Sequence, residues 1–133
     1  MRPVAICVSD LERAAKFYEN VIDMKRVDDE SLGTGSAIYM SDGVINLALL
    51  KFKSDRMASI EDSKNFVGTH HFGIQLDDLA EAQRKIEASG GTFHFDFGTK
   101  EKANFEKKVR DPDGILFDIS KNGWVGTDRQ QER

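Results

Sequence analysis

CVSDLERAAKFYENV, residues 7–21, lines up with QLDDLAEAQRKIEAS, residues 75–89, at an offset of 68 residues (Asp78 minus Asp10). Each copy contains a β-type run, an acidic pair or near-pair, a leucine and a helical pattern in the same order. Further along, SDG at residues 41–43 corresponds to DPDG at residues 111–114. A repeat of this length exceeds the unit of a solenoid. The sequence therefore predicts two similar modules in one fold, which can build a cleft between their halves.

The composition is that of a soluble globular protein, because the 133 residues are 39% apolar and 32% charged. The net charge is −4, and Lys and Arg are scattered among Asp and Glu, which argues against a nucleic-acid surface. The longest apolar run, Leu47–Leu50, is far below the roughly 18 residues of a membrane span. The start of the chain lacks a signal-peptide pattern, and a lone Cys7 fits a reducing compartment. We expect a cytoplasmic protein with no nucleic-acid and no membrane partner.

The first half reads as one strand, one helix and three strands. Val4, Ile6 and Val8 alternate with smaller residues, as in a half-buried strand. Ser9 or Asp10 can cap the helix that follows, whose apolar positions form one stripe. Further strands are expected at about residues 25–29, 36–40 and 45–52, separated by the turn signals LGTG and SDG.

The second half repeats this order. A strand is expected over residues 71–76, followed by a helix that Asp77 or Asp78 caps and that Gly90 and Gly91 end. Three strands are expected near residues 92–97, 105–110 and 116–120. The basic stretch from Lys100 to Arg110 also contains Glu101 and Glu106, and we expect it to be a solvated hairpin. We predict a single domain over residues 1–126, with modules at about 1–52 and 69–121, a connection at 53–68 and a loose tail at 127–133.

Two βαβββ modules with these motifs resemble the vicinal oxygen chelate superfamily, which includes glyoxalase I, extradiol dioxygenases, fosfomycin and bleomycin resistance proteins and methylmalonyl-CoA epimerase. The resemblance rests on VAICVSDLERAAKFYENVIDM (4–24), HHFGIQLDDLAEA (70–82) and VRDPDGILFDIS (109–120). It implies an α+β fold in which a cup-shaped, mostly antiparallel curved sheet has its helices outside and a small-molecule site inside. Related two-module chains commonly pair, so the resemblance also implies a homodimer.

Strand alternation predicts which side chains face into such a cup. The helices need an apolar partner, so the side chains of Val4, Ile6 and Val8 are assigned to them. The same argument places Phe72, Ile74 and Leu76 against the second helix. The positions left facing the cup are Pro3, Ala5, Cys7, Asn46, Ala48, His71, Gly73, Gln75 and Asp118.

In many members of the superfamily, four side chains from the first and last strands of the two modules hold one divalent metal. Carried over to this sequence, these positions are Pro3, Ala48, His71 and Asp118. Pro3 and Ala48 offer no atom to a metal, and Asn46 is only a weak oxygen donor one pleat away. Two strong ligands are too few for a tight site. The resemblance therefore implies no cofactor or one weakly held divalent metal on His71 and Asp118, and the metal-free reading is favoured.

His71 and Asp118 are the candidate catalytic residues, because a carboxylate beside an imidazole fixes the tautomer of the ring and makes an acid/base pair. A half-buried structural histidine is the alternative for His71. His70 has the opposite alternation and is expected to pack or face solvent. Candidate ligand-binding residues are Asn46, Gln75, Cys7 and His94. For Cys7 a buried apolar role is preferred to a nucleophilic one, and for His94 a solvent-facing position is preferred to one lining the cup.

Two classes of function remain open. The first is a lyase, isomerase or oxygenase-type enzyme with a degenerate metal site that acts on a small carbonyl, carboxylate or aromatic compound. The second is a metal-free binding protein of the bleomycin-resistance kind that sequesters its ligand. The missing donors of the first module favour the second class, whereas the facing histidine and aspartate of the second module favour the first.

Overall fold

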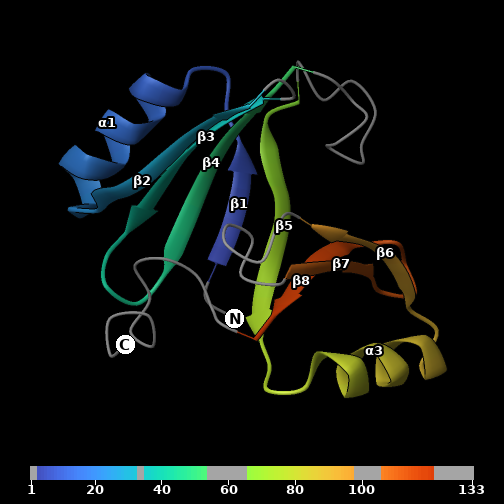
Figure 1. Ribbon diagram of the computed structural model, residues 1–133. Coiled ribbons are helices and arrows are strands. Elements are labelled where there is room, and N and C mark those ends of the chain that lie inside the picture. The colour runs from blue at the N-terminus through green and yellow to red at the C-terminus, as the bar shows by residue number, and fades with distance from the viewer. Residues whose placement is uncertain (1–2, 33–34, 54–65, 98–105, 122–133) are drawn as a thin grey trace.

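Two βαβββ units make up the part of the chain that the computed structural model describes, residues 3–32, 35–53, 66–97 and 106–121 (Figure 1). The first unit consists of β1 (Pro3–Cys7), α1 (Leu11–Ile22), β2 (Lys25–Leu32), β3 (Gly35–Ser41) and β4 (Asn46–Phe52). The second consists of β5 (Gly68–Gln75), α3 (Leu79–Ala88), β6 (Thr92–Phe97), β7 (Glu106–Arg110) and β8 (Leu116–Ser120). The expected repeat of one strand, one helix and three strands is confirmed in both halves.

The described strands form one eight-stranded sheet in the order β2-β3-β4-β1-β5-β8-β7-β6. The two units meet at its centre, where β1 and β5 pair antiparallel, while β1 with β4 and β5 with β8 are parallel. The order therefore reads the same from either edge once each strand is replaced by its counterpart in the other unit. Figure 1 shows α1 beside β2–β4 and α3 beside β6–β8. This is the curved α+β sheet that the sequence predicts.

In the described part of the chain, α1 and α3 each follow an aspartate that caps the helix. The side chain of Asp10 accepts a hydrogen bond from the backbone N–H of Arg13 at 3.1 Å, and that of Asp78 accepts one from Glu81 at 3.0 Å. Such caps satisfy backbone donors that the first helical turn leaves without partners. After α3, Gly90 has a φ of 96°, a conformation that a glycine adopts without strain. Of the two candidate caps in each module, the structure selects the second.

A cluster of buried apolar side chains lies between α1 and the sheet. Its side chains are Ala15, Met24, Ile38, Met40 and Leu49, with Ile6, Val8, Leu11, Ala14, Tyr18 and Leu47 packed against them. Ile6 and Val8 therefore face the helix, as their alternation predicts. We call the opposite face of the sheet the inner face. On β1 it carries Pro3, Ala5 and Cys7, all of which are buried.

The second unit departs from the sequence prediction at its first strand, because β5 begins at Gly68 rather than near residue 71. The register between β1 and β5 shifts between Ala5 and Ile6, which marks a β-bulge. Most of the expected connection (residues 54–65) and the expected tail (127–133) lie outside the described residues. Within the described ranges, no helix is long and apolar enough to cross a membrane.

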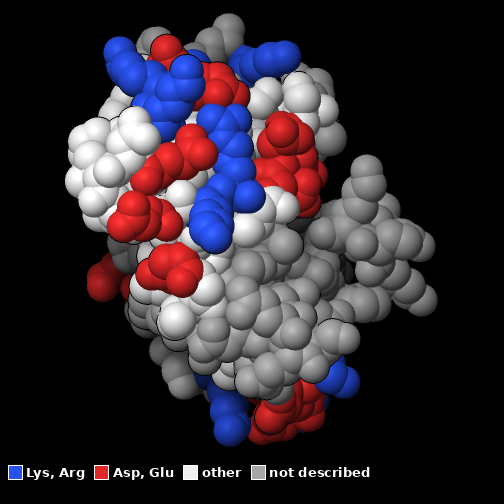
Figure 2. Space-filling model, turned by 90° about the vertical axis from the view of Figure 1, so that its left-hand side faces the viewer, with Lys and Arg blue, Asp and Glu red and all other residues white. Residues whose placement is uncertain are grey.

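Charges of both signs interleave on the face of the molecule that carries α1 and β2. Figure 2 shows Lys and Arg side chains running between groups of Asp and Glu on this face. Arg26 of β2 lies 2.7 Å from a carboxylate oxygen of Glu12 and 3.7 Å from one of Glu19, both on α1. The hydrogen bond from Arg26 holds the pKa of Glu12 below its ordinary value. Ion pairs therefore link α1 to β2 on this face, and the charged side chains there are not all of one sign.

Candidate functional site

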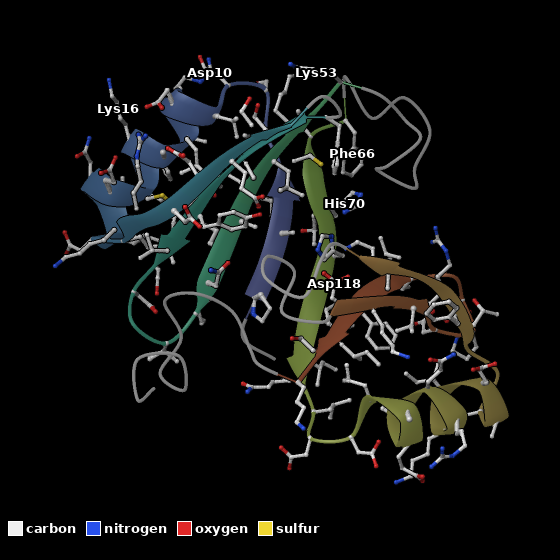
Figure 3. All side chains as sticks on the ribbon, viewed as in Figure 1. Asp10, Lys16, Lys53, Phe66, His70 and Asp118 are labelled. Carbon is white, nitrogen blue, oxygen red and sulfur yellow. The ribbon has the colours of Figure 1, made fainter. Side chains whose placement is uncertain are left out.

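His71 and Asp118 meet on the inner face where β5 lies beside β8. The register pairs Asp118 with Gly73, which shares the face of His71 two residues along the same strand. His71 Nε2 lies 3.1 Å from Asp118 Oδ2, and the two side chains are 15% and 4% exposed. Figure 3 shows Asp118 pointing toward the ring nitrogens beside β5. The structure therefore brings together the two residues that the sequence singles out as the candidate acid/base pair.

Lys108 of β7 holds the other oxygen of the same carboxylate. It is paired with Asp118 across the β7–β8 hairpin, and its Nζ lies 2.7 Å from Asp118 Oδ1. The Lys108 side chain is only 8% exposed. The expectation that this basic stretch is a solvated hairpin is wrong at Lys108. Counting outward from the DPDG turn, which pairs Arg110 with Leu116, places Lys108 opposite Asp118 and could have identified it.

Asp118 is a buried carboxylate that stays ionised. Burial alone raises its pKa, but the hydrogen bond from His71 and the charge of Lys108 outweigh this effect, so the pKa lies below its ordinary value. A buried anion with no counter-charge would instead take up a proton. The negative charge on the inner face is therefore balanced by the ammonium group of Lys108.

His70 lies on the same side of β5 as His71, contrary to the alternation expected of a regular strand. The Nδ1 atoms of the two rings are 2.6 Å apart, and their centroids are 4.9 Å apart. The register pairs Ala5 with His71 and Ile6 with Thr69, so His70 is the extra residue of the bulge. A bulge interrupts the strict alternation of strand side chains, so the predicted opposite alternation of His70 is wrong, although its predicted packing role agrees with the structure. The His70 ring also packs at 5.2 Å from the ring of Phe52.

For a neutral His71 ring, the contacts indicate which ring nitrogens carry protons. An ionised carboxylate only accepts hydrogen bonds, so the Nε2 of His71 donates to Asp118. In a neutral His71 ring the Nδ1 is then the acceptor, and the Nδ1–H of His70 donates to it. Lys108, Asp118, His71 and His70 thus form a continuous series of polar contacts, which we call the polar chain.

The first unit has different chemistry at the equivalent places. Ala5 and Gly73 are counterparts, because they are 68 residues apart, which is the offset of the repeat. The register pairs Ala5 with Ala48 and Gly73 with Asp118, so Ala48 is the counterpart of Asp118. Tyr39 is paired with Ala48, as Lys108 is with Asp118. The hydroxyl of Tyr39 donates a hydrogen bond to the carboxylate of Glu30 on β2. A neutral phenol therefore stands in the first unit where the second has a buried cation.

The remaining residues predicted from the sequence lie in separate places. Asn46 is 1% exposed and is paired with Pro3 of β1. The amide nitrogen of Gln75 donates to the backbone carbonyl of Lys121 at 3.1 Å, so this group is tied to the end of β8. Cys7 is buried, and burial raises the pKa of its thiol to about 11. The side chain of His94 lies outside the described residues.

The inner face does not fit a divalent metal of the family type. Pro3 and Ala48 supply no donor atom, and both oxygens of Asp118 already contact Lys108 or His71. Over the described part of the chain, no group of three or more His, Cys, Asp or Glu side chains is arranged to hold a metal ion. A metal would have to compete with the Lys108 ammonium for the same carboxylate.

These features define a class of protein in which two βαβββ units form one curved sheet with its polar side chains on the inner face. A family model of the Glyoxalase/Bleomycin resistance protein/Dioxygenase superfamily matches residues 1–119. The chain belongs to this superfamily. A search of curated protein sequences found no significant match.

Solved structures of low sequence identity share the fold. A hypothetical protein, BH1468 from Bacillus halodurans C-125, is 16% identical with a TM-score of 0.70, over 93% of this chain and 94% of the other. A variant of Streptomyces coelicolor methylmalonyl-CoA epimerase in complex with 2-nitronate-propionyl-CoA is 14% identical with a TM-score of 0.70, over 92% and 97%. The methylmalonyl-CoA epimerase from Mycobacterium tuberculosis is 19% identical with a TM-score of 0.68, over 92% and 87%. At these identities the likeness shows the fold alone.

Proposed function

We propose that this protein binds a small carbonyl or carboxylate compound on the inner face of its sheet and moves a proton on it, as an isomerase or lyase does. The observation that carries the proposal is the contact between His71 and Asp118, with His70 on the far side of the same imidazole. A carboxylate that orients one ring nitrogen leaves the other nitrogen to exchange a proton. That other nitrogen, the Nδ1 of His71, contacts the Nδ1 of His70, so the two rings together would exchange the ligand's proton.

The electrostatics of the polar chain support proton transfer. Asp118 is ionised and mostly shielded from water, so it stabilises a positive charge that develops on the histidines. The His71 side chain is 15% exposed, so this part of the polar chain lies close to the surface of the inner face. Proton removal beside a carbonyl is also the chemistry that epimerisation of a thioester substrate requires. The epimerases that share the fold therefore favour this reaction class over an oxygenase.

Sequestration without chemistry is the second candidate. It is favoured by the first unit, where Pro3 and Ala48 provide no acid or base on the inner face, so any reaction relies on the second unit alone. A protein that only needs to enclose its ligand has no use for an oriented histidine. The two candidates therefore differ in what His71 does to the bound molecule.

Hydrogen exchange on a bound ligand distinguishes the two. Carbonyl, carboxylate and aromatic metabolites that raise the melting temperature would be incubated with the protein in deuterated water, and the recovered compound analysed by mass spectrometry. Proton transfer predicts deuterium at a carbon next to a carbonyl, with a rate that falls about a hundredfold or more in His71→Gln while the affinity changes little. Thr69→Ala, at an exposed position of the same strand, is the matched control. A ligand recovered without deuterium would support sequestration.

We propose further that the protein acts as a homodimer in the cytoplasm. The dimer is supported by family resemblance and by three exposed apolar side chains of α1, namely Phe17, Val21 and Ile22. Sedimentation equilibrium should give about twice the chain mass of 14.9 kDa. A mass of one chain across the concentrations tested would refute the dimer.

A further inference from the structure

The ammonium group of Lys108 supplies the positive charge that the inner face needs beside the carboxylate of Asp118. Asp118 is only 4% exposed, and a carboxylate shielded from water in this way requires a positive partner close by. Lys108 provides that partner at 2.7 Å from Oδ1, while His71 contacts Oδ2 at 3.1 Å. Side chains of the protein itself thus contact both oxygens of the Asp118 carboxylate.

A divalent ion at this carboxylate would meet two obstacles. It would have to displace either Lys108 or His71 from an oxygen of Asp118, because each oxygen has a partner. It would also bring two positive charges next to the Lys108 ammonium, whose side chain is only 8% exposed and is therefore little screened by water. Lys108 contributes to both obstacles, by occupying one oxygen of Asp118 and by its charge, and neither obstacle depends on the missing donors at Pro3 and Ala48.

We infer that Lys108 is the cation that balances Asp118 on the inner face, and that its charge opposes the binding of a divalent metal to His71 and Asp118. The second unit has kept the histidine and the carboxylate of a metal site, and the lysine takes over the charge-balancing role of the metal. Tyr39 at the equivalent place in the first unit is neutral, which fits a place where Ala48 leaves no anion to balance.

Metal titration of matched lysine variants tests this inference. Isothermal titration with Ni²⁺, Zn²⁺ and Mn²⁺ would compare the wild-type protein, Lys108→Met, and Lys108→Met combined with Asp118→Asn. Lys107→Met is the control, because Lys107 neighbours Lys108 on the same strand but its Nζ bonds Gln83 of α3. We expect Lys108→Met to bind metal about tenfold or more tightly than the wild type and the control, and the double variant to lose this gain.

Thermal melting gives a second readout that does not require activity. Metal that binds the folded Lys108→Met variant should raise its melting temperature, with no such rise in the wild type. If Lys108→Met does not fold, Lys108→Gln carries the same comparison. Equal metal affinity in wild type and a folded lysine variant would overturn the inference. So would selective broadening of the His71 ring signals of the wild-type protein by micromolar Mn²⁺. Because titration and melting measure no turnover, their outcome is separate from that of the hydrogen-exchange experiment.

Discussion

His71 and Lys108 hold the two oxygens of one buried carboxylate, Asp118, at 3.1 Å and 2.7 Å. The three residues come from three consecutive strands of the sheet, β5, β8 and β7. His70 extends the series on the far side of His71 through the bulge in β5. Strand order and register therefore produce the contacts of the polar chain. Each of its residues can be substituted to test the contact that it makes.

Asp118→Asn should lower the free energy of unfolding by about 3 to 5 kcal/mol, because it leaves the Lys108 ammonium buried without its anion. Urea denaturation followed by circular dichroism would measure the loss. Asp113→Asn, in the exposed turn before β8, should change stability by no more than about 0.5 kcal/mol. A loss below about 1 kcal/mol for Asp118→Asn would mean that the pair contributes as little as a surface ion pair.

The free energy of unfolding should also depend on pH through Asp118. Its pKa in the folded protein lies below that of the unfolded chain, about 3.9, so the unfolded state binds more protons in the interval between the two values. The stability that Asp118 contributes is present above about pH 4 and is lost as the pH falls through the folded-state pKa. Urea midpoints between pH 2 and 6 should therefore fall more steeply on acidification in the wild type than in Asp118→Asn. Parallel curves for the two proteins would contradict the lowered pKa.

The neutral ring of His71 should carry its proton on Nε2, because this atom donates to the ionised Asp118. A long-range proton–nitrogen correlation spectrum above the pH range of imidazole titration would identify the tautomer of each ring. In Asp118→Asn the side-chain oxygen is a weaker acceptor, so the preference should decrease. A wild-type spectrum with the proton on Nδ1 of His71 would reverse the direction of the polar chain.

Cys7 should react slowly with iodoacetamide in the folded protein. Burial raises its pKa to about 11, so the thiolate that carries out the attack is scarce near pH 8. Mass spectrometry should show alkylation roughly a hundredfold or more slower in buffer than in urea, where the thiol has an ordinary pKa. Equal rates in buffer and urea would show that the thiol is accessible and activated, and would return Cys7 to the set of candidate nucleophiles.

Much of the fold could be predicted because alternation and capping are local properties of the chain. The alternation of Ile6 and Val8 with Ala5 and Cys7 correctly assigned the two faces of β1, since apolar side chains pack against α1. Asp10 and Asp78 preceded their helices as caps do. The same alternation led to the wrong face for His70, because a bulge depends on how β5 pairs with β1 and leaves no unambiguous signal in one strand.

The two modules, their helices and the presence of the histidine and aspartate pair in only one of them could be predicted from residue order. Residue order is enough for these features because it encodes repeats, periodicity and the chemistry of single side chains. Tertiary structure decided what surrounds that pair. Lys108 reaches Asp118 only through the β7–β8 register, and His70 reaches His71 only through the bulge. Both contacts arise between or within paired strands, where the geometry of the sheet, and not the order of residues, sets which polar atoms meet.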